Sequence, residues 1–309
     1  MTQTTDARID FRLLVQNEIT NSPTGRIEDI AFKKPIILGG CGSSGTTLLK
    51  TILDSHKNIA CGREISFFDR PRLFKTTKTD LHRMFLEQNF QELDSDQLFP
   101  LMTQFGTYFG LFLPNSGKHY HSFAATNRIF DKASDLKHFF DLYFSNFAAG
   151  RGKKRWAEKT PNNVFCIEQI LEFFPDGKFV HVIRDGRDVV LSLTGSRSFN
   201  LHAAIIRWLL AVGAGIRHRG HPRYYEIKYE DIVLNTEPTL RGLMEFLDEE
   251  YDPAMLDFQR AGQDNPLGYG STPIFTDSIG KWKKADLDPG VKETMHLTLT
   301  PLLEKCRYN

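Results

Sequence analysis

Residues 35–49 read Pro35-Ile36-Ile37-Leu38-Gly39-Gly40-Cys41-Gly42-Ser43-Ser44-Gly45-Thr46-Thr47-Leu48-Leu49. An apolar segment leads into a glycine-rich turn, and the turn leads into a segment with apolar residues at helical spacing. We therefore predict a buried strand over residues 36–38, a tight turn, and a helix that ends near residue 56. This strand, loop and helix are typical of α/β proteins that hold a phosphate group at a helix N-terminus.

The loop resembles a P-loop in outline, since its glycines are spaced Gly40-x-x-x-x-Gly45-Thr46-Thr47. Thr46, however, stands where a nucleoside triphosphatase places the lysine that reaches the β- and γ-phosphates. Backbone N–H groups, two hydroxyls and a helix N-terminus still suffice to hold one phosphate. We therefore expect a nucleotide other than a triphosphate.

Short apolar segments alternate with amphipathic ones along most of the chain, which predicts a parallel sheet covered by helices. Further strands are expected at 58–61, 155–158, 179–183 and 224–228, and helices at 161–174, 201–217, 236–247 and after residue 289. Thr160 is expected to cap the helix at 161–174, which should bury Phe165, and Asp185 to cap a helix after the strand at 179–183. Residues 65–150 show helical periodicity without strands and hold more than half of the chain's 25 phenylalanines, which predicts a helical insertion with an aromatic core. The predicted fold class is α/β: one domain over residues 34–309 with a P-loop-like central parallel sheet flanked by helices, after a leader over residues 1–33.

Composition narrows the function classes. The 309-residue chain is 40% hydrophobic and carries a net charge of +1, so no global field favours nucleic acid or an anionic membrane. The four cysteines are far apart and show no C-x-x-C spacing, which argues against a disulfide framework or a zinc site. The polar N-terminus and the lack of a long apolar run predict a cytoplasmic protein without a membrane span.

Polar residues follow every predicted strand. Because ligands of open α/β sheets bind beyond the carboxyl ends of the strands, we expect these residues to surround one site. They are Gly42, Ser43, Ser44, Gly45, Thr46 and Thr47 after the first strand, Arg63 and Glu64 after the second, Glu158, Lys159 and Thr160 after the third, Arg184, Asp185, Arg187 and Ser192 after the fourth, and Tyr229, Glu230 and Asp231 after the fifth. Cations and hydroxyls bind anions, and a carboxylate accepts a proton, so the set suits phosphate chemistry.

The ordered segments resemble the sulfotransferase family, which uses 3′-phosphoadenosine-5′-phosphosulfate (PAPS). The resemblance covers residues 35–70 and 155–285. Residues 42–49 with Leu53-Asp54-Ser55-His56 resemble the 5′-phosphosulfate loop, and Val182-Ile183-Arg184-Asp185-Gly186-Arg187-Asp188 with Ser192 resembles the 3′-phosphate segment. Ala157-Glu158-Lys159-Thr160-Pro161 and Ile227-Lys228-Tyr229-Glu230-Asp231 are further landmarks, and Cys61-Gly62-Arg63-Glu64 is most similar to the tyrosylprotein and carbohydrate branch.

The resemblance implies a role for each candidate residue. Transfer of a sulfuryl group from PAPS to a hydroxyl would leave adenosine 3′,5′-bisphosphate, with a carbohydrate, a peptidyl tyrosine or a small-molecule alcohol as acceptor. Glu64 would be the general base, and Lys159 would offset the charge of the transferring group. The cofactor-binding residues would be Gly42, Ser43, Ser44, Gly45, Thr46 and Thr47 for the phosphosulfate, Arg184 and Ser192 for the 3′-phosphate, and Tyr229. No metal is required, and the sequence contains no metal-ligand cluster.

Ser43 departs from the family pattern, because family members usually carry Arg or Lys there, in contact with the sulfuryl group. Loss of one such donor costs about 10²–10³ in rate. Arg63, Lys159, Lys281 and Lys283 are the candidates to replace it. Two other functions stay open: a P-loop-type nucleotide kinase, which needs a loop lysine and an acidic Mg²⁺ ligand, and a sulfotransferase homologue that binds the nucleotide without catalysis.

Several candidates also have a purely structural explanation. The glycine-rich loop could be only a tight turn, and residues 184–187 could form a surface turn. Glu64 could be a solvated carboxylate, and Tyr229 a core tyrosine whose hydroxyl holds a loop.

Overall fold

A computed structural model of the chain describes residues 27–62, 64–83, 121, 123–258 and 276–308. The chain divides into two compact units, one of Met1–Ala31 with Lys75–Phe147 and one of Phe32–Phe74 with Ala148–Asn309. The second unit contains the sheet and every described residue that the sequence assigns to the candidate site.

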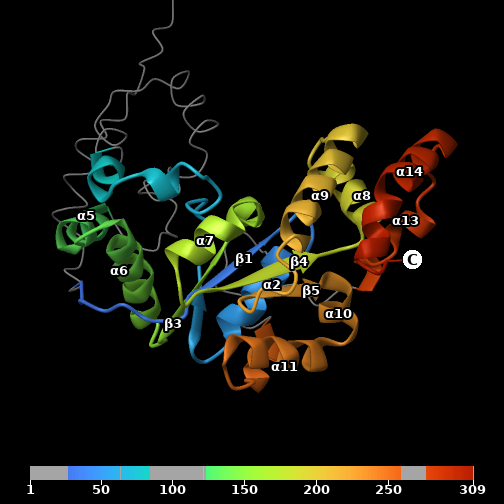
Figure 1. Cartoon of the computed structure of the whole chain (residues 1–309). Coiled ribbons are helices and arrows are strands. Elements are labelled where there is room, and N and C mark those ends of the chain that lie inside the picture. Colours follow the sequence, from blue (N-terminus) through green and yellow to red (C-terminus); the bar gives the residue numbers. More distant parts are fainter. Residues whose placement is uncertain (1–26, 63, 84–120, 122, 259–275, 309) are drawn as a thin grey trace, which may run out of the picture. The chain divides into compact units, whose positions relative to one another are not determined.

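The sheet has five parallel strands in the order β2-β3-β1-β4-β5 (Figure 1). They are β1 (Ile36–Gly40), β2 (Ile59–Cys61), β3 (Arg155–Lys159), β4 (Lys178–Ile183) and β5 (Tyr224–Lys228). All five predicted strands are confirmed, as is the α/β fold class. The first strand lies in the middle, where Leu38 is in register with Lys159 on one side and Val180 on the other.

Helices cover both faces of this sheet (Figure 1). On one face pack α2 (Thr46–Ser55), α10 (Tyr229–Leu234), α11 (Thr236–Leu247) and the 3₁₀ turn η5 (Pro253–Asp257). Their shared core contains Ile36, Leu38, Leu49, Ile52, Leu53, Val180, Val182, Ile227, Leu240, Leu243, Met244 and Leu247. Alternate residues of each strand point to this face, as the period of two requires.

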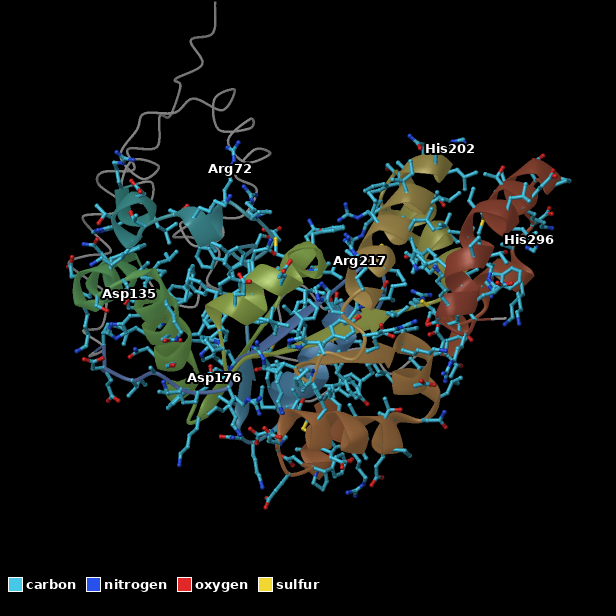
Figure 2. The ribbon with its side chains drawn as sticks, viewed as in Figure 1. Arg72, Asp135, Asp176, His202, Arg217 and His296 are labelled. Atoms are coloured by element: carbon cyan, nitrogen blue, oxygen red, sulfur yellow. The ribbon has the colours of Figure 1, made fainter. Side chains whose placement is uncertain are left out.

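The opposite face carries the 3₁₀ turn η4 (Pro161–Cys166), α7 (Ile167–Phe173), α8 (Gly186–Ser196) and α9 (Leu201–Ile216). The helices α13 (Lys281–Lys284) and α14 (Pro289–Lys305) pack against α8 and α9. The labelled histidines His202 and His296 are exposed on α9 and α14 (Figure 2). None of the helices within the described ranges is long and apolar enough to cross a membrane.

Two local expectations were wrong. The predicted helix over 161–174 is the 3₁₀ turn η4 followed by α7, and Phe165, expected in its core, is 42% exposed. Thr160 precedes η4 but makes no capping bond, because its hydroxyl donates to Glu158 instead. The helix α10 was not predicted, since Tyr229 begins it directly after β5 with no loop between them.

The other unit contains α5 (Phe123–Lys132), and most of α6 (Leu136–Ala149) belongs to it. Phe130 and Phe139 stack with ring centroids 4.0 Å apart, and Phe140, Tyr143 and Phe144 continue the aromatic contacts. Between residues 65 and 150 the described part forms helices and no strand, in agreement with the predicted helical character. Most of the predicted leader, residues 1–26, lies outside the described residues.

The helix α9 approaches the sheet through Gly215. A Cβ atom there would lie 2.1 Å from Nδ1 of the buried His181 on β4, whereas a Cβ at Gly213 would have no described heavy atom outside the helix backbone within 4 Å. We predict that Gly215→Ala lowers the free energy of unfolding by about 1–3 kcal/mol through overpacking. Gly213→Ala in the same helix should raise it by about 0.5–1 kcal/mol. Urea unfolding of both variants checks this, and equal effects would contradict the assigned contact.

Candidate functional site

The candidate site lies beyond the carboxyl end of β1, between its neighbours β3 and β4. The chain leaves β1 toward the β2 side of the sheet and later returns to β4 on the other side, so this is a topological switch point. Residues that follow three strands therefore meet there. Lys159 ends β3, Arg184 follows β4, and the glycine-rich loop follows β1.

The loop between β1 and α2 is held in a conformation that needs its small residues. Ser43 has φ 67° and Gly45 has φ 93°, both in the left-handed region. The N–H of Ser44 donates to the carbonyl of Cys41 at 3.1 Å, which closes the turn. A Cβ at Gly45 would lie 2.3 Å from Cδ2 of Tyr229, so the backbone approaches that ring more closely than any other residue type allows.

The N-terminus of α2 suits an anion. The helix begins at Thr46 with Gly45 as its N-cap, has no side-chain cap, and carries no acidic residue in its first turn. Its first N–H groups and its partial positive charge therefore face the loop without a neutralising side chain. Oγ of Ser44 is buried and has no hydrogen-bond partner among the described residues. These features fit a site for an anionic group such as a phosphate.

The two predicted catalytic residues, Glu64 and Lys159, are in contact. The side chain of Lys159 is only 4% exposed, and its Nζ forms an ion pair with Oε1 of Glu64, whose side chain is 46% exposed. The same Nζ donates to Oγ1 of Thr47 in the first turn of α2, at 3.3 Å. The carboxylate of Glu64, the buried ammonium of Lys159 and the glycine-rich loop therefore meet at one point.

A second glutamate, Glu158, is completely buried one residue earlier on β3. It accepts hydrogen bonds from Oγ1 of Thr160 and Nδ2 of Asn163, each at 2.6 Å. Thr160 Oγ1 also accepts from the N–H of Ser66 at 3.1 Å, and Asn163 Nδ2 donates to the carbonyl of Leu38 at 3.1 Å. This network ties the segment that follows Glu64 to the ends of β1 and β3. Burial raises the pKa of Glu158 to about 7 against the opposing effect of these bonds.

Arg184 holds the loop from the β4 side. Its Nη1 donates to the carbonyl of Ser43 at 2.9 Å, and its Nη2 donates to the carbonyl of Ser278. The guanidinium stacks on the ring of Tyr229 at 4.7 Å, and the hydroxyl of Tyr229 hydrogen-bonds to Oγ of Ser278. Nε of Arg184 is buried and has no partner among the described residues, so this arginine retains one donor for a ligand.

The remaining predicted residues lie on or beside α8. Asp185 caps this helix, as predicted, by accepting from the N–H of Arg187 at 2.9 Å. Ser192 lies on α8 and is half-buried. Lys281 and Lys283 are exposed on α13. Arg63, the other candidate cation, lies outside the described residues.

Three residues near the site were not found from the sequence. Asp188 accepts from the N–H groups of Gly280 and Trp282 and so attaches the start of α13 to α8. Trp208 donates from Nε1 to the carbonyl of Arg184 at 3.0 Å, and Arg207 lies beside the glycine-rich loop. Each acts across a long sequence separation on a backbone atom or a glycine, and no local motif marks such a contact.

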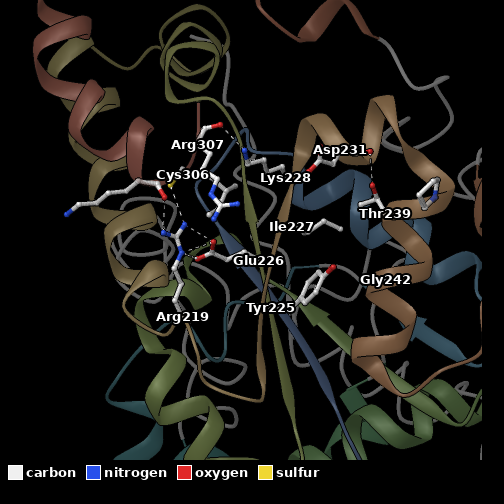
Figure 3. Close-up of a pocket in the computed structure, with 13 residues that line it drawn as sticks. Arg219, Tyr225, Glu226, Ile227, Lys228, Asp231, Thr239, Gly242, Cys306 and Arg307 are labelled. Atoms are coloured by element: carbon white, nitrogen blue, oxygen red, sulfur yellow. Dashed lines mark hydrogen bonds and ion pairs between the residues drawn. The ribbon is translucent and has the colours of Figure 1, made fainter. Parts of the chain in front are cut away.

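A separate hollow of about 480 Å³ lies beside β5, α11 and the C-terminal residues (Figure 3). Its lining includes Asp231, which was expected near the candidate site, but no residue to which the resemblance gives a catalytic or cofactor-binding role. Two of its cations are engaged, since Arg219 pairs with Glu226 at 2.8 Å and Lys228 donates to the carbonyl of Arg307 at 3.1 Å. We therefore assign these contacts to the attachment of the C-terminus to β5.

The cysteines are all buried thiols, and burial raises the pKa of Cys41 to about 12. Within the described ranges, no group of three or more His, Cys, Asp or Glu side chains could hold a metal ion.

A profile of the sulfotransferase family matches residues 35–253, which confirms the resemblance drawn from the sequence. Protein-tyrosine sulfotransferase A of Caenorhabditis elegans is 23% identical over 267 residues, covering 80% of this chain and 60% of that protein. Protein-tyrosine sulfotransferase of Drosophila melanogaster is 23% identical over 231 residues, covering 72% of this chain and 39% of that protein. The chain thus spans 60% or less of the length of these two relatives.

Two solved structures share the fold. The sulfotransferase domain of the Synechococcus PCC 7002 olefin synthase superposes with a TM-score of 0.63 at 20% identity, covering 93% of this chain and 99% of that domain. The sulfotransferase domain of the curacin biosynthetic pathway gives a TM-score of 0.57 at 16% identity, covering 91% and 99%. At these identities the likeness establishes the fold alone.

The buried Glu158 generates a pH prediction. Its pKa is about 7 in the folded chain and near 4.5 as a free side chain, so between these values the folded state binds more protons than the unfolded state. Stability from this group is therefore largest below pH 4.5 and is lost as the pH rises toward 7. Relative to Glu158→Gln, the wild type should lose on the order of 3 kcal/mol between pH 4.5 and 8. Urea unfolding across this range tests it: the exposed Glu172→Gln should follow the wild-type profile, and a Glu158→Gln profile parallel to wild type would refute it.

Proposed function

The chain belongs to the sulfotransferase family, and from this premise we propose that it transfers a sulfuryl group from PAPS to a hydroxyl of an acceptor. PAPS supplies an activated phosphosulfate when bound. The bond between sulfur and the bridging oxygen breaks and a bond from sulfur to the acceptor oxygen forms. The leaving electron pair stays on adenosine 3′,5′-bisphosphate.

The carrying observation is the contact of Lys159 with both Glu64 and Thr47. Glu64 accepts the proton of the acceptor hydroxyl as the oxygen attacks. Lys159 holds the carboxylate next to the loop, and its charge opposes the negative charge of the transferring group. Because the ammonium is buried and the carboxylate is half-exposed, the carboxylate is the member of the pair that an acceptor can reach from solvent.

We assign nucleotide binding to the glycine-rich loop, the start of α2, and residues on or beside α8. The first N–H groups of α2, with Ser44 and the hydroxyls of Thr46 and Thr47, hold the phosphosulfate. The cation of Arg184 and the hydroxyl of Ser192 hold the 3′-phosphate. The ring of Tyr229 packs against both Gly45 and the guanidinium of Arg184. Thr46 leaves the loop without the lysine that a kinase needs, which disfavours ATP.

The acceptor is a hydroxyl compound. The relatives in Caenorhabditis elegans and Drosophila melanogaster are named protein-tyrosine sulfotransferases, so tyrosyl peptides come first in an acceptor screen, followed by carbohydrates and small alcohols.

The nucleotide assignment predicts a binding preference. Calorimetric titration should show adenosine 3′,5′-bisphosphate binding much more tightly than ATP with Mg²⁺. Ser192→Ala should weaken the binding of the bisphosphate by roughly 10- to 100-fold, the worth of one hydrogen bond to a charged group. Ser196→Ala, one turn further along the same exposed end of α8, is the matched control and should bind as wild type. A preference for ATP, or binding of neither nucleotide, would contradict the proposal.

The base assignment predicts a loss of turnover without a loss of binding. Glu64→Gln keeps the side-chain size but cannot accept the proton, so sulfuryl transfer to an acceptor found in the screen should fall by about 10²–10⁴. Adenosine 3′,5′-bisphosphate should still bind, since Glu64 does not contact the loop residues that hold it. Glu172→Gln on the exposed face of α7 serves as the control. Unchanged turnover in Glu64→Gln would remove Glu64 from the mechanism.

A further inference from the structure

Transfer from a phosphosulfate develops negative charge on the sulfuryl oxygens and on the bridging oxygen, and cations placed there stabilise it. The glycine-rich loop supplies none, since residues 41–47 contain no Lys or Arg. Lys159 is engaged with Glu64, and Arg184 bonds two backbone carbonyls. A further cation from outside the loop would therefore add to the positive charge at the site.

Arg207 is placed beside the loop by α9. Its neighbour Trp208 is buried, donates to the carbonyl of Arg184, and would lie 2.7 Å from a Cβ at Gly186. These contacts fix the rotation of α9 against the end of β4. The next residue back along the helix, Arg207, then lies with Nε 3.8 Å from the Cβ position of Gly42.

The guanidinium of Arg207 lies over the ring of Phe199, 5.7 Å from its centroid, and makes one hydrogen bond to a described residue. Its Nη2 donates to Oδ1 of Asn162 at 3.0 Å. Among the described residues no carboxylate forms an ion pair with Arg207. A guanidinium has five N–H donors, so a charged side chain held by one neutral amide has donors left for an anion.

The position of Arg207 beside Gly42 also brings its charge close to Cys41, in the same loop. Its guanidinium lowers the pKa of the Cys41 thiol, in partial opposition to the burial that raises it. Arg197 acts in the same direction but more weakly, from an exposed position at the end of α8. Arg207 is half-buried, so water weakens the effect of its charge less than it weakens that of Arg197.

We propose that Arg207 is the cation that contacts the sulfuryl end of the donor, in the role that Ser43 cannot fill. This inference rests on the proposed function. The N–H groups at the start of α2 already serve the 5′-phosphate, whereas Arg207 lies at Gly42, at the β1 end of the loop. There its N–H groups bind the sulfuryl oxygens while the sulfur leaves the bridging oxygen, bonds to the acceptor oxygen, and the acceptor proton passes to Glu64.

The test compares PAPS with adenosine 3′,5′-bisphosphate, which lacks the sulfuryl group, by calorimetric titration of the full chain. Arg207→Gln should weaken PAPS binding by roughly 10- to 100-fold, as expected for a charged hydrogen bond, and change the affinity for the bisphosphate by less than about 3-fold. The PAPS affinity of Arg207→Lys should lie between that of the wild type and that of Arg207→Gln. Arg217→Gln, on the exposed C-terminal end of the same helix, should match wild type.

Other outcomes overturn the inference. A parallel loss of both ligands with a lower Tm would make Arg207 a brace between α9 and the loop, and unchanged binding of both would leave it without a role. If Arg207→Gln does not fold, Arg207→Lys decides the question, because one ammonium cannot keep both Asn162 and the sulfuryl oxygens in a planar fork. Failure of the wild type to bind either nucleotide would overturn the proposed function itself.

Discussion

A buried ammonium at the end of β3 organises the candidate site. Lys159 is almost without solvent contact, and a charge in that position is tolerated only with a partner of opposite charge. Glu64 provides that partner, and Thr47 adds a hydrogen bond from the first turn of α2. The contacts of Lys159 thereby bring the segment after β2 and the glycine-rich loop after β1 to the same point. The same contacts that stabilise the buried charge therefore also assemble the site.

Two glutamates within this site are placed in opposite environments. Glu158 is buried, and desolvation raises its pKa to about 7, whereas Glu64 is half-exposed and paired with an ammonium. The bonds of Glu158 to Thr160 and Asn163 hold the backbone near Ser66, only two residues beyond Glu64. We infer a division of labour in which the buried glutamate positions the segment and the exposed one meets the acceptor.

The sequence predicted the strands and the convergence of polar residues well, because both follow from local patterns. A short apolar run marks β4, and parallel strands bring their carboxyl ends to one edge of the sheet. It failed where a side chain serves a distant partner: Thr160 was expected to cap a helix but donates to buried Glu158, and Phe165 leaves the core because η4 is not an α-helix. The position of Arg207 depends on how α9 packs against β4, which periodicity alone does not determine.

The same packing explains how a loop without a cation can lie in a site for an anion. In this fold β1 is central, so its loop is reached from α9 as well as from the ends of β3 and β4. Gly215 lets α9 approach His181, and Trp208 joins the helix to the carbonyl of Arg184. A charge displaced from position 43 onto α9 thus remains beside Gly42. Because residues 41–47 contain no Lys or Arg, positive side-chain charge at this loop comes from the elements packed around it.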